Sequence, residues 1–432
     1  MNNILQVSDK LNELLRGRGV SIFETCVSES EKRELNTEKA DFNLFRTIFN
    51  CGVSVTVIQD GRKGAASGND LSDEGIEKVV ADALAAADSA IPDEANAIAE
   101  AEKPEVFRTG VYEADMPKLY DSVKAMMDTV GRDYPKVNLM AVVADHTCSH
   151  KLYVNSNGTR FEHFDGAYSI TVEMSGSDGE RNTGLDYVGL TTHDLDTPLL
   201  SQGGLKQHMK DTEASLNSVP LPGKFEGTVI FTPDCLGNFI YMLASNYIMG
   251  SVIMEGTSQW LNRLGEKVAS EKVSITLKAQ DDRLATAQPF TGDGYLSEDV
   301  KVIEKGVLNS FLLNLYAARK TGRPVTKNTS FAMVMEPGDT ALADMIASVD
   351  RGLIVGGFSG GEPGVNGEFS GVAKNSFYVE NGKIVGAVTE TMINGNLENI
   401  FKNAAAVSKE QVCDGSSVLP YLSCGGIVVS GK

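Results

Sequence analysis

The chain has 432 residues, of which 42% are apolar and 22% are charged, which is typical of a globular protein and excludes a disordered chain. Its 39 basic and 58 acidic residues give a net charge of −19, which disfavours direct binding to nucleic acid because phosphates require a basic surface. The length exceeds that of one ordinary core, so we expect two or three domains.

The six cysteines are scattered and form no C-x-x-C pair, so we expect reduced thiols in a cytoplasmic protein. The first residues lack the basic and apolar stretches of a signal peptide. One run of twenty uncharged residues, Cys235–Met254, is long enough to cross a bilayer. Polar residues interrupt this run and no basic cluster flanks it, so we predict no membrane span. We predict instead a helix that starts near Pro233, is apolar on nearly all sides and is therefore buried.

Helices and strands follow one another in the first 110 residues. Ser8–Arg16 has the spacing of a short amphipathic helix. Asp60-Gly61 is a hairpin turn between Gly52–Gln59 and the segment after it. Ser72 is the expected N-cap of the next helix. Two further strand candidates are Ser21–Ser28 and Leu44–Phe49. Residues 88–110 have little periodicity and are interpreted as a linker or a crossing segment.

The central part is expected to hold a helix that opens at Asp115 and then an antiparallel meander. The meander strands are predicted at Val137–Asp145, Lys151–Asn155, Thr159–His163 and Tyr168–Ser175. Asn157-Gly158 is its tightest turn. Leu195–Ser218 is expected to be helical, and Pro220–Gly223 is the clearest domain boundary.

Beyond that boundary the chain is rich in strands separated by Asn-Gly, Asp-Gly and Lys-Gly turns. The predicted strands are Val273–Leu277, Val300–Glu304, Val307–Leu315, Ser330–Glu336, Gly352–Gly356, Ser376–Glu380, Lys383–Val388 and Gly426–Ser430, with a helix at Leu397–Val407. Elements of one kind come in blocks, so the fold class is α+β, with mixed and antiparallel sheets, helices in the N-terminal half and a strand-rich C-terminal domain. The expected domains are 1–110, 111–220 and 221–432.

Two motifs outside the uncharged run could carry chemistry. His146, Cys148 and His150 would share one face of a strand and could bind zinc, but no second element supplies matching ligands. We expect a plain surface strand there, and solvated side chains at His193 and His208. Ser359 lies in a G-x-S-x-G motif, yet the glycine- and proline-rich segment after it cannot start the helix of a nucleophile elbow. A glycine-rich loop is the preferred interpretation of this segment.

Acidic residues at Asp281-Asp282, Asp293 and Glu298-Asp299 could bind a cation or serve as acid and base, but they lack calcium-loop spacing. We interpret them as a solvated surface of an acidic protein.

Short motifs are spread over nearly the whole chain, at Gly52–Ser67, Tyr153–Gly158, Gly265–Ser270, Gly306–Leu308, Asn314–Lys320, Asn366–Gly371, Val379–Lys383 and Ile393–Leu397. Together they resemble the TldD/PmbA family, whose members are described as metallopeptidases and as candidate modulators of DNA gyrase. Each motif is weak alone, but their order and spacing together are specific.

The TldD branch of that family binds zinc with an H-E-x-x-x-H motif and a cysteine near the C-terminus. The motif lies on the helix that corresponds to the one predicted here to start near Pro233. Counted from Pro233, the three motif positions here hold Tyr241, Met242 and Asn246, which are poor replacements for two imidazoles and a carboxylate. Neither Cys413 nor Cys424 matches the spacing of the family cysteine. The chain therefore resembles the TldE/PmbA branch, which lacks the metal motif.

The resemblance implies a zinc-free, pseudo-enzyme subunit that needs no cofactor of its own and assists a TldD-type zinc peptidase in the proteolysis of unfolded peptides. The family motifs place the peptide contacts at Asn366, Phe369, Ser370, Asn394 and Asn396. Self-association as a homodimer is an alternative assembly. A stand-alone binding or regulatory homodimer without hydrolytic activity is the second interpretation. A hydrolase that uses Ser359, or a metal at His146, Cys148 and His150, is the third.

Overall fold

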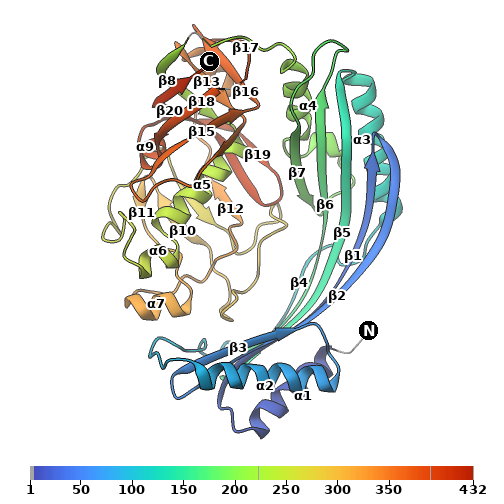
Figure 1. Ribbon diagram of the computed structural model, residues 1–432, viewed down its shortest axis with the longest axis vertical. Coiled ribbons are helices and arrows are strands. Elements are labelled where there is room, and N and C mark those ends of the chain that lie inside the picture. The colour runs from blue at the N-terminus through green and yellow to red at the C-terminus, as the bar shows by residue number, and fades with distance from the viewer. Residues whose placement is uncertain (1–3, 222, 390, 432) are drawn as a thin grey trace.

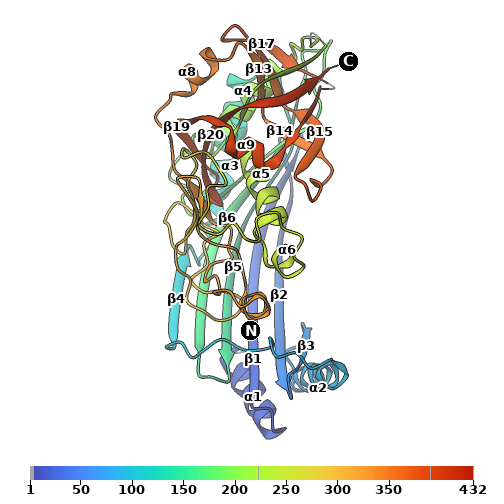
Figure 2. The ribbon, with the colours of Figure 1, turned by 90° about the vertical axis from the view of Figure 1, so that its left-hand side faces the viewer.

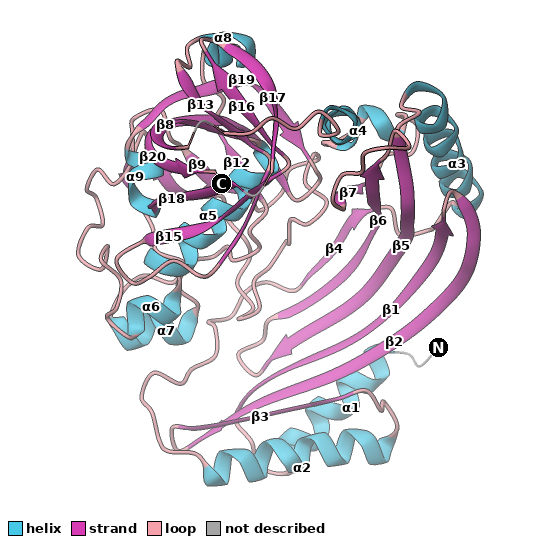
Figure 3. Cartoon of the chain, turned by 45° about the horizontal axis from the view of Figure 1, so that its top comes forward, coloured by secondary structure: helices cyan, strands magenta, loops and turns pink. Residues whose placement is uncertain are grey.

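The computed structural model describes residues 4–221, 223–389 and 391–431, and it has the α+β architecture expected from the sequence (Figure 1). Strands between residues 22 and 192 form one sheet, and strands between residues 224 and 430 form a second. The second half of the chain stands against the concave side of the first sheet, whose long strands curve around it (Figures 1 and 3).

The first sheet has seven strands among the described residues, in the order β3-β2-β1-β5-β6-β4, with β7 also paired to β6. These strands are β1 (Ile22–Glu38), β2 (Asp41–Gln59), β3 (Arg62–Gly68), β4 (Glu105–Gly110), β5 (Val137–Asn155), β6 (Arg160–Gly176) and β7 (Asp186–Thr192). Apart from the parallel pair of β4 and β6, every pairing is antiparallel.

The predicted strands of this half were too short. Leu44–Phe49 and Gly52–Gln59 belong to one strand, β2, and the four meander strands are the two long strands β5 and β6 around the Asn157-Gly158 turn. Residues 88–110 are also more than a linker, because their last part is β4. Polar residues interrupt the apolar alternation in these segments, but a neighbouring strand pairs along nearly the full length and keeps each strand continuous.

Four helices and a single 3-10 turn accompany this sheet in the described residues. They are α1 (Ile4–Gly17), α2 (Asp73–Ser89), α3 (Met116–Asp133), α4 (Leu205–Ala214) and the 3-10 turn Leu199–Ser201. The Gly75 N–H donates to Ser72 Oγ at 3.2 Å and the Lys118 N–H donates to Asp115 Oδ1 at 3.0 Å, so both predicted N-caps are confirmed. The long helix predicted over Leu195–Ser218 is wrong in extent, since only α4 and the 3-10 turn form.

The second sheet has thirteen strands in the described part of the chain. They are β8 (Lys224–Phe231), β9 (Ile275–Leu277), β10 (Val300–Glu304), β11 (Val307–Leu308), β12 (Met333–Met335), β13 (Arg351–Val355), β14 (Gly357–Gly360), β15 (Glu368–Lys374), β16 (Ser376–Glu380), β17 (Lys383–Val388), β18 (Thr391–Asn396), β19 (Ala404–Cys413) and β20 (Ser417–Ser430). The central path runs β12-β20-β8-β13-β16, and β8 is parallel to β13 and antiparallel to β20.

The helices of this half are α5 (Pro233–Tyr247), α6 (Gly250–Met254), α7 (Leu315–Thr321), α8 (Leu342–Ala347) and α9 (Leu397–Lys402). The predicted helix Leu397–Val407 is wrong beyond Lys402, where β19 begins, and the predicted strand Val307–Leu315 ends at Leu308. No helix among the described residues is long and apolar enough to cross a membrane.

The two halves touch at three levels (Figures 1 and 2). At one end, Asp93 accepts a hydrogen bond from Tyr316 Oη at 2.9 Å and pairs with Lys320 Nζ at 2.7 Å. In the middle, Phe290 packs against rings of the first sheet, and the Tyr153 hydroxyl donates to the Asp293 carbonyl at 2.9 Å. At the other end, the Thr191 N–H donates to the Asp414 carbonyl at 2.8 Å.

His208 is the charged contact at that last level, and the expectation that it is solvated was wrong. Its Nδ1 lies 2.7 Å from Asp186 and its Nε2 lies 2.9 Å from Asp234, the second residue of α5. Burial alone would lower the pKa of His208, but the hydrogen bonds and charges of both carboxylates raise it to about 10. A protonated His208 therefore connects the start of α5 to β7 of the first sheet.

We predict that His208→Gln lowers the free energy of unfolding at pH 7 by about 3 kcal/mol, because the Asp186 carboxylate stays buried without its cation. The folded-state pKa of His208 lies above the ordinary histidine value of 6.5, so the stabilisation is complete below about pH 6.5 and is lost as the pH rises through about 10. Urea unfolding of the native chain and of His208→Gln from pH 6 to pH 10.5 should show that the difference between their free energies of unfolding becomes smaller as the pH rises.

Lys78→Gln is the control for this prediction, because Lys78 pairs with Asp82 on an exposed helix face and its loss costs at most about 0.5 kcal/mol. If the difference in free energy of unfolding between the native chain and His208→Gln stayed constant up to pH 10.5, the stabilisation would not come from a protonated His208.

Candidate functional site

The candidate site is built around α5, which begins directly after strand β8. The strand ends at Phe231, the hydroxyl of Thr232 accepts from the Cys235 N–H at 3.4 Å, and Pro233 occupies the first helical turn. Asp234 follows at the positive end of the helix dipole. The predicted helix start near Pro233 is thus confirmed. The uncharged run itself divides into α5 and α6.

One face of α5 lies in the main core of the second half. Phe239 is fully buried, and its ring centroid lies 4.7 Å from that of Phe231 and 5.2 Å from those of Phe358 and Phe369. The other buried residues of the helix are Pro233, Cys235, Leu236, Ile240, Leu243, Ala244 and Tyr247. This spacing of three and four residues puts the apolar contacts on one stripe.

The opposite face of α5 is open, so the prediction that the whole helix is buried was wrong. Asp234, Asn238 and Tyr241 are exposed, and 53% of Tyr241 is accessible. The Tyr241 ring packs at 5.6 Å against Phe331, a residue with a left-handed φ of 55°. The sequence did not indicate this open face, because Asp234 is the only charged residue on it. Its other exposed residues, Asn238 and Tyr241, are uncharged.

The three motif positions lie on or beside this open face. Tyr241 is exposed, Met242 is half-buried and packs against the core, and Asn246 is half-buried. The Asn246 side chain donates to the Gly364 carbonyl at 3.3 Å, which ties the loop 361–367 to the helix. A phenol, a thioether and an amide do not fit a zinc site, because none offers the imidazole or carboxylate donors that zinc prefers.

The two late cysteines do not complete a thiolate site. Cys424 is buried, and burial raises the pKa of its thiol to about 12. Burial also raises the pKa of Cys413, whose sulfur donates to the Arg283 carbonyl at 3.2 Å. Among the described residues, no group of three or more histidine, cysteine or acidic side chains is arranged to hold a metal ion.

The five predicted peptide contacts gather at the β15–β18 pair. Ser370 is exposed and lies opposite Asn394 across the two strands, whereas Phe369 points into the core. Asn396 caps α9 and donates to the Asn366 carbonyl at 2.8 Å. Asn366 in turn accepts from the Glu368 N–H at 3.2 Å, so both asparagines hold the loop before β15. Ser370 and Asn394 therefore lie on the face of the strand pair opposite the core, and Asn366 is exposed in the loop.

The G-x-S-x-G segment is a strand, and our interpretation of it as a loop was wrong. Ser359 lies in β14 opposite Val372 of β15, and the chain continues into loop 361–367 and β15 without a helix. The oxyanion donors of a nucleophile elbow are therefore missing next to Ser359.

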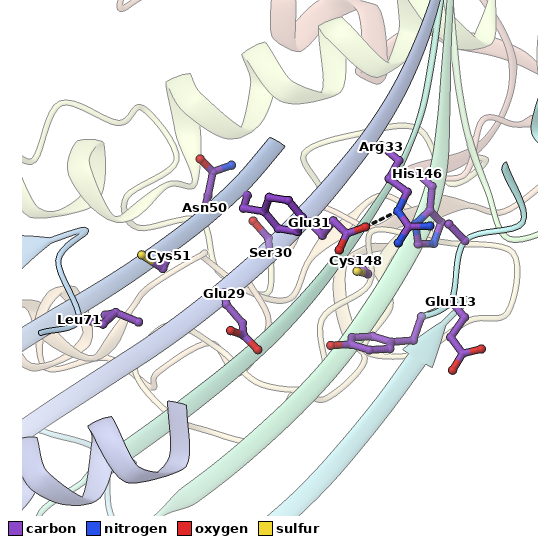
Figure 4. Close-up of a pocket in the computed structure, with 13 residues that line it drawn as sticks. Glu29, Ser30, Glu31, Arg33, Asn50, Cys51, Leu71, Glu113, His146 and Cys148 are labelled. Carbon is purple, nitrogen blue, oxygen red and sulfur yellow. Dashed lines mark hydrogen bonds and ion pairs between the residues drawn. The ribbon is translucent and has the colours of Figure 1, made fainter. Parts of the chain in front are cut away.

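The largest cavity that we describe lies on the outer face of the first sheet and has a volume of about 910 Å³ (Figure 4). His146 and Cys148 line it, together with Glu29, Glu31 and Arg33 of β1. His146 Nε2 lies 2.6 Å from the Val111 carbonyl, and burial lowers the pKa of its imidazole.

His150, the third residue of that possible zinc motif, stacks on Phe164 at 4.1 Å, and its Nε2 lies 2.8 Å from Glu162. The two imidazoles are thus engaged separately and do not converge on Cys148.

The acidic residues are distributed over separate partners. Asp281 pairs with Arg283 at 2.8 Å, Glu298 pairs with Lys327 at 3.0 Å, and Asp299 pairs with Lys278. Asp293 accepts from the Leu315 N–H at 2.8 Å. Each of these four carboxylates therefore has a partner within the fold.

The chain is an α+β protein, and α5 carries Tyr241, Met242 and Asn246 where the resemblance places a zinc motif. Two models of one family match the chain: PmbA/TldA metallopeptidase domain 1 over residues 24–87 and the PmbA/TldA metallopeptidase C-terminal domain over residues 223–431. The chain belongs to the TldD/PmbA family.

Relatives and solved structures agree with this assignment. The Metalloprotease PmbA homolog of Haemophilus influenzae is 26% identical over 391 residues, which cover 87% of this chain and 85% of that protein. TldE from Thermococcus kodakarensis has the same fold, with a TM-score of 0.85, 21% identity and coverage of 98% of this chain and 100% of that one. A candidate modulator of DNA gyrase from Bacteroides thetaiotaomicron gives a TM-score of 0.85 at 23% identity, with both chains fully covered.

The two faces of α5 should respond differently to truncation. We predict that Phe239→Ala lowers the free energy of unfolding by about 3–5 kcal/mol, because it opens a cavity between three other phenylalanines. Tyr241→Ala should cost less than about 1 kcal/mol, because the side chain is half exposed. Urea unfolding of the two variants tests this, and equal losses would contradict the open face of α5.

Proposed function

We propose that this chain is the zinc-free, TldE/PmbA-like subunit of a cytoplasmic two-subunit metallopeptidase. In this proposal it helps to bind an unfolded peptide, and a TldD-type partner supplies the zinc, the water and the general base. The observation that carries the proposal is the open face of α5, where Tyr241, Met242 and Asn246 stand at the three motif positions.

The contacts of these three residues support a structural and peptide-binding role. Asn246 holds the loop 361–367 against the helix, and the loop leads into β15, where Ser370 is exposed beside Asn394. Tyr241 and Phe331 add a pair of aromatic rings at α5. A surface of this kind suits an extended peptide, because peptide groups need donors and acceptors and side chains need apolar contact.

The first experiment measures metal and activity together. The purified chain should contain no stoichiometric zinc by elemental analysis and should not cleave an unstructured peptide such as reduced, unfolded casein. Addition of a TldD-type subunit from the same organism should restore cleavage, and a chelator should abolish it. One zinc per chain, with chelator-sensitive cleavage by the chain alone, would overturn the proposal.

The second experiment tests the peptide contacts. We predict that Ser370→Ala together with Asn394→Ala weakens binding of an unfolded peptide by about 10-fold, because two hydrogen-bonding groups are lost. The free energy of unfolding should change by less than about 0.5 kcal/mol, as for other exposed substitutions. Fluorescence anisotropy of a labelled peptide in the presence of the TldD-type subunit gives the affinity.

Glu77→Ala on the exposed face of α2 is the matched control for the peptide experiment, and its affinity should equal that of the native chain. An unchanged affinity in the Ser370/Asn394 double variant would remove these residues from the proposed binding surface.

A further inference from the structure

A cavity of about 710 Å³ lies between the two halves, at the end of the molecule opposite α1 and α2 (Figures 1 and 3). The first half lines it with residues 181–187, which lead into β7, and with residues between 211 and 218, at the end of α4 and just after it. The second half lines it with residues 372–376, where β15 passes into β16, and with residues 387–389 at the end of β17. A ligand in this cavity therefore contacts both halves.

Strand β15 connects this cavity with the peptide surface proposed above. Side chains alternate between the two faces of a strand, so Ser370, Val372 and Lys374 share one face, and the residues of β15 between them are buried. Ser370 is a proposed peptide contact, whereas Val372 and Lys374 line the cavity. An extended peptide advances by roughly 3.3 Å per residue, as a strand does, so a peptide that follows β15 from Ser370 enters the cavity within a few residues.

The free charge in the cavity is positive. Four charged side chains line it, and three of them have partners, in the pairs Arg181–Asp178, Asp186–His208 and Gln207–Asp211. The fourth, Lys374, is exposed, and its ammonium group has no ion pair or hydrogen bond within the described part of the chain. This group attracts a carboxylate locally, although the chain as a whole has a net charge of −19.

Exposed apolar side chains line the cavity on the side of the first half. Leu185 is 52% exposed and Tyr187 is 57% exposed. Val372 of β15 is half-buried and lines the cavity from the second half. A ligand side chain that covers such surface removes it from water, which is favourable. The cavity therefore suits an aliphatic side chain as well as a carboxylate.

One wall of the cavity carries a buried hydroxyl without a partner. Thr212 lines the cavity, is 4% exposed, and its Oγ1 has no hydrogen-bond partner among the described residues. Buried polar groups normally have one, because desolvation without a hydrogen bond is unfavourable. A peptide group offers both a donor and an acceptor, so an extended chain in the cavity supplies the missing partner.

We propose that this cavity binds a segment of the peptide that carries a carboxylate beside an aliphatic side chain. The carboxylate pairs with the ammonium group of Lys374, and the aliphatic side chain packs against Leu185 and Tyr187. The peptide backbone follows β15 from Ser370 and bonds to the Thr212 hydroxyl. The carboxylate belongs either to an acidic side chain or to the C-terminus of the peptide, which share this chemistry.

The inference rests on the proposed function, because it extends the same peptide surface along β15. It adds a preference for peptides that combine a negative charge with an aliphatic residue. It also assigns part of the peptide binding to the first half of the chain, through Leu185 and Tyr187, whereas α5 and β15 belong to the second half.

The test compares three labelled, unstructured peptides of equal length by fluorescence anisotropy, with the chain and a TldD-type subunit together and a chelator present to prevent cleavage. The first ends in leucine-glutamate and is amidated, the second ends in leucine-glutamine and is amidated, and the third ends in leucine-glutamine with a free carboxylate. The native chain should bind the first or the third about 5-fold more tightly than the second. The tighter of these two identifies the source of the carboxylate. The preference should become smaller at about 0.5 M salt, because salt screens the ion pair.

Two residues of the cavity are changed separately. Lys374→Gln should abolish the preference for a carboxylate, and Lys374→Arg should keep it, because only arginine retains the positive charge. The affinity for the amidated glutamine peptide should be the same in these two variants and in the native chain. Leu185→Ala should weaken the binding of all three peptides by about 3-fold, because part of the apolar contact is lost.

Two matched variants control for the loss of a charge and of an exposed apolar side chain. Lys383→Gln removes an exposed lysine of β17, and Ile384→Ala truncates its neighbour, which is 51% exposed. Neither residue lines the cavity, so both variants should bind the three peptides as the native chain does. Circular dichroism and urea unfolding of each variant check that the fold is kept.

Equal affinities of the native chain for the three peptides, or a preference that survives Lys374→Gln, would overturn the inference. The Ser370/Asn394 double variant separates this failure from that of the proposed function. If the double variant weakens binding while Lys374→Gln has no effect, the peptide surface stands and the cavity is not part of it. If no peptide binds to the native chain and the TldD-type subunit together, the inference and the proposed function both fail.

Discussion

The ion pair of His208 with Asp186 and Asp234 is the interaction on which the placement of the site depends. Asp234 belongs to the first turn of α5, and Asp186 begins β7 of the first sheet. The negative charge of Asp234 is favoured twice, by the positive end of the helix and by the imidazolium. Because His208 and Asp186 are largely buried, this contact is less screened than a surface pair. The first turn of α5 is thereby joined to β7 of the first sheet.

Glycine is needed where the two halves come closest. Gly415 has a φ of 85°, and a Cβ built on it would lie 1.7 Å from the Thr191 carbonyl oxygen. Any larger side chain would push β7 away from the second half at the level of the His208 clamp. The ion pair and the glycine thus both support the contact between β7 and the second half of the chain. The ion pair attracts the two parts, and the glycine leaves room for their backbones to approach.

Features that depend on neighbouring residues in the sequence, such as turns and helix caps, were predicted correctly. Features that depend on distant residues, such as strand lengths, were not. The turn at Asp60-Gly61 and the caps Ser72 and Asp115 depend on φ preferences and on hydrogen bonds within four residues, so they could be predicted. The lengths of β5 and β6 depend on neighbouring strands far away in the chain. Along these strands one face packs under helices and the other faces the second half, so no simple alternation marks their extent.

The sequence predicted the helix that carries the candidate site, but not which of its residues are exposed. The resemblance placed three residues on α5, yet Asn246 acquires its partner, Gly364, across 118 residues of sequence. Phe369 was expected to contact a peptide, whereas its ring packs against Phe239 and Phe358 in the core. A phenylalanine in a motif looks the same in the sequence whether it binds a ligand or supports the strand that does. The packing of β15 on α5 separates the two roles.

The residues at the motif positions also explain how the α5 face can be stable without a metal. Tyr241 packs on Phe331, Met242 packs on the core, and Asn246 donates to a carbonyl, so each side chain is satisfied locally. The Asn246 amide holds the loop 361–367 to the helix. These contacts agree with our proposal that this chain contributes binding surface while another subunit supplies the chemistry.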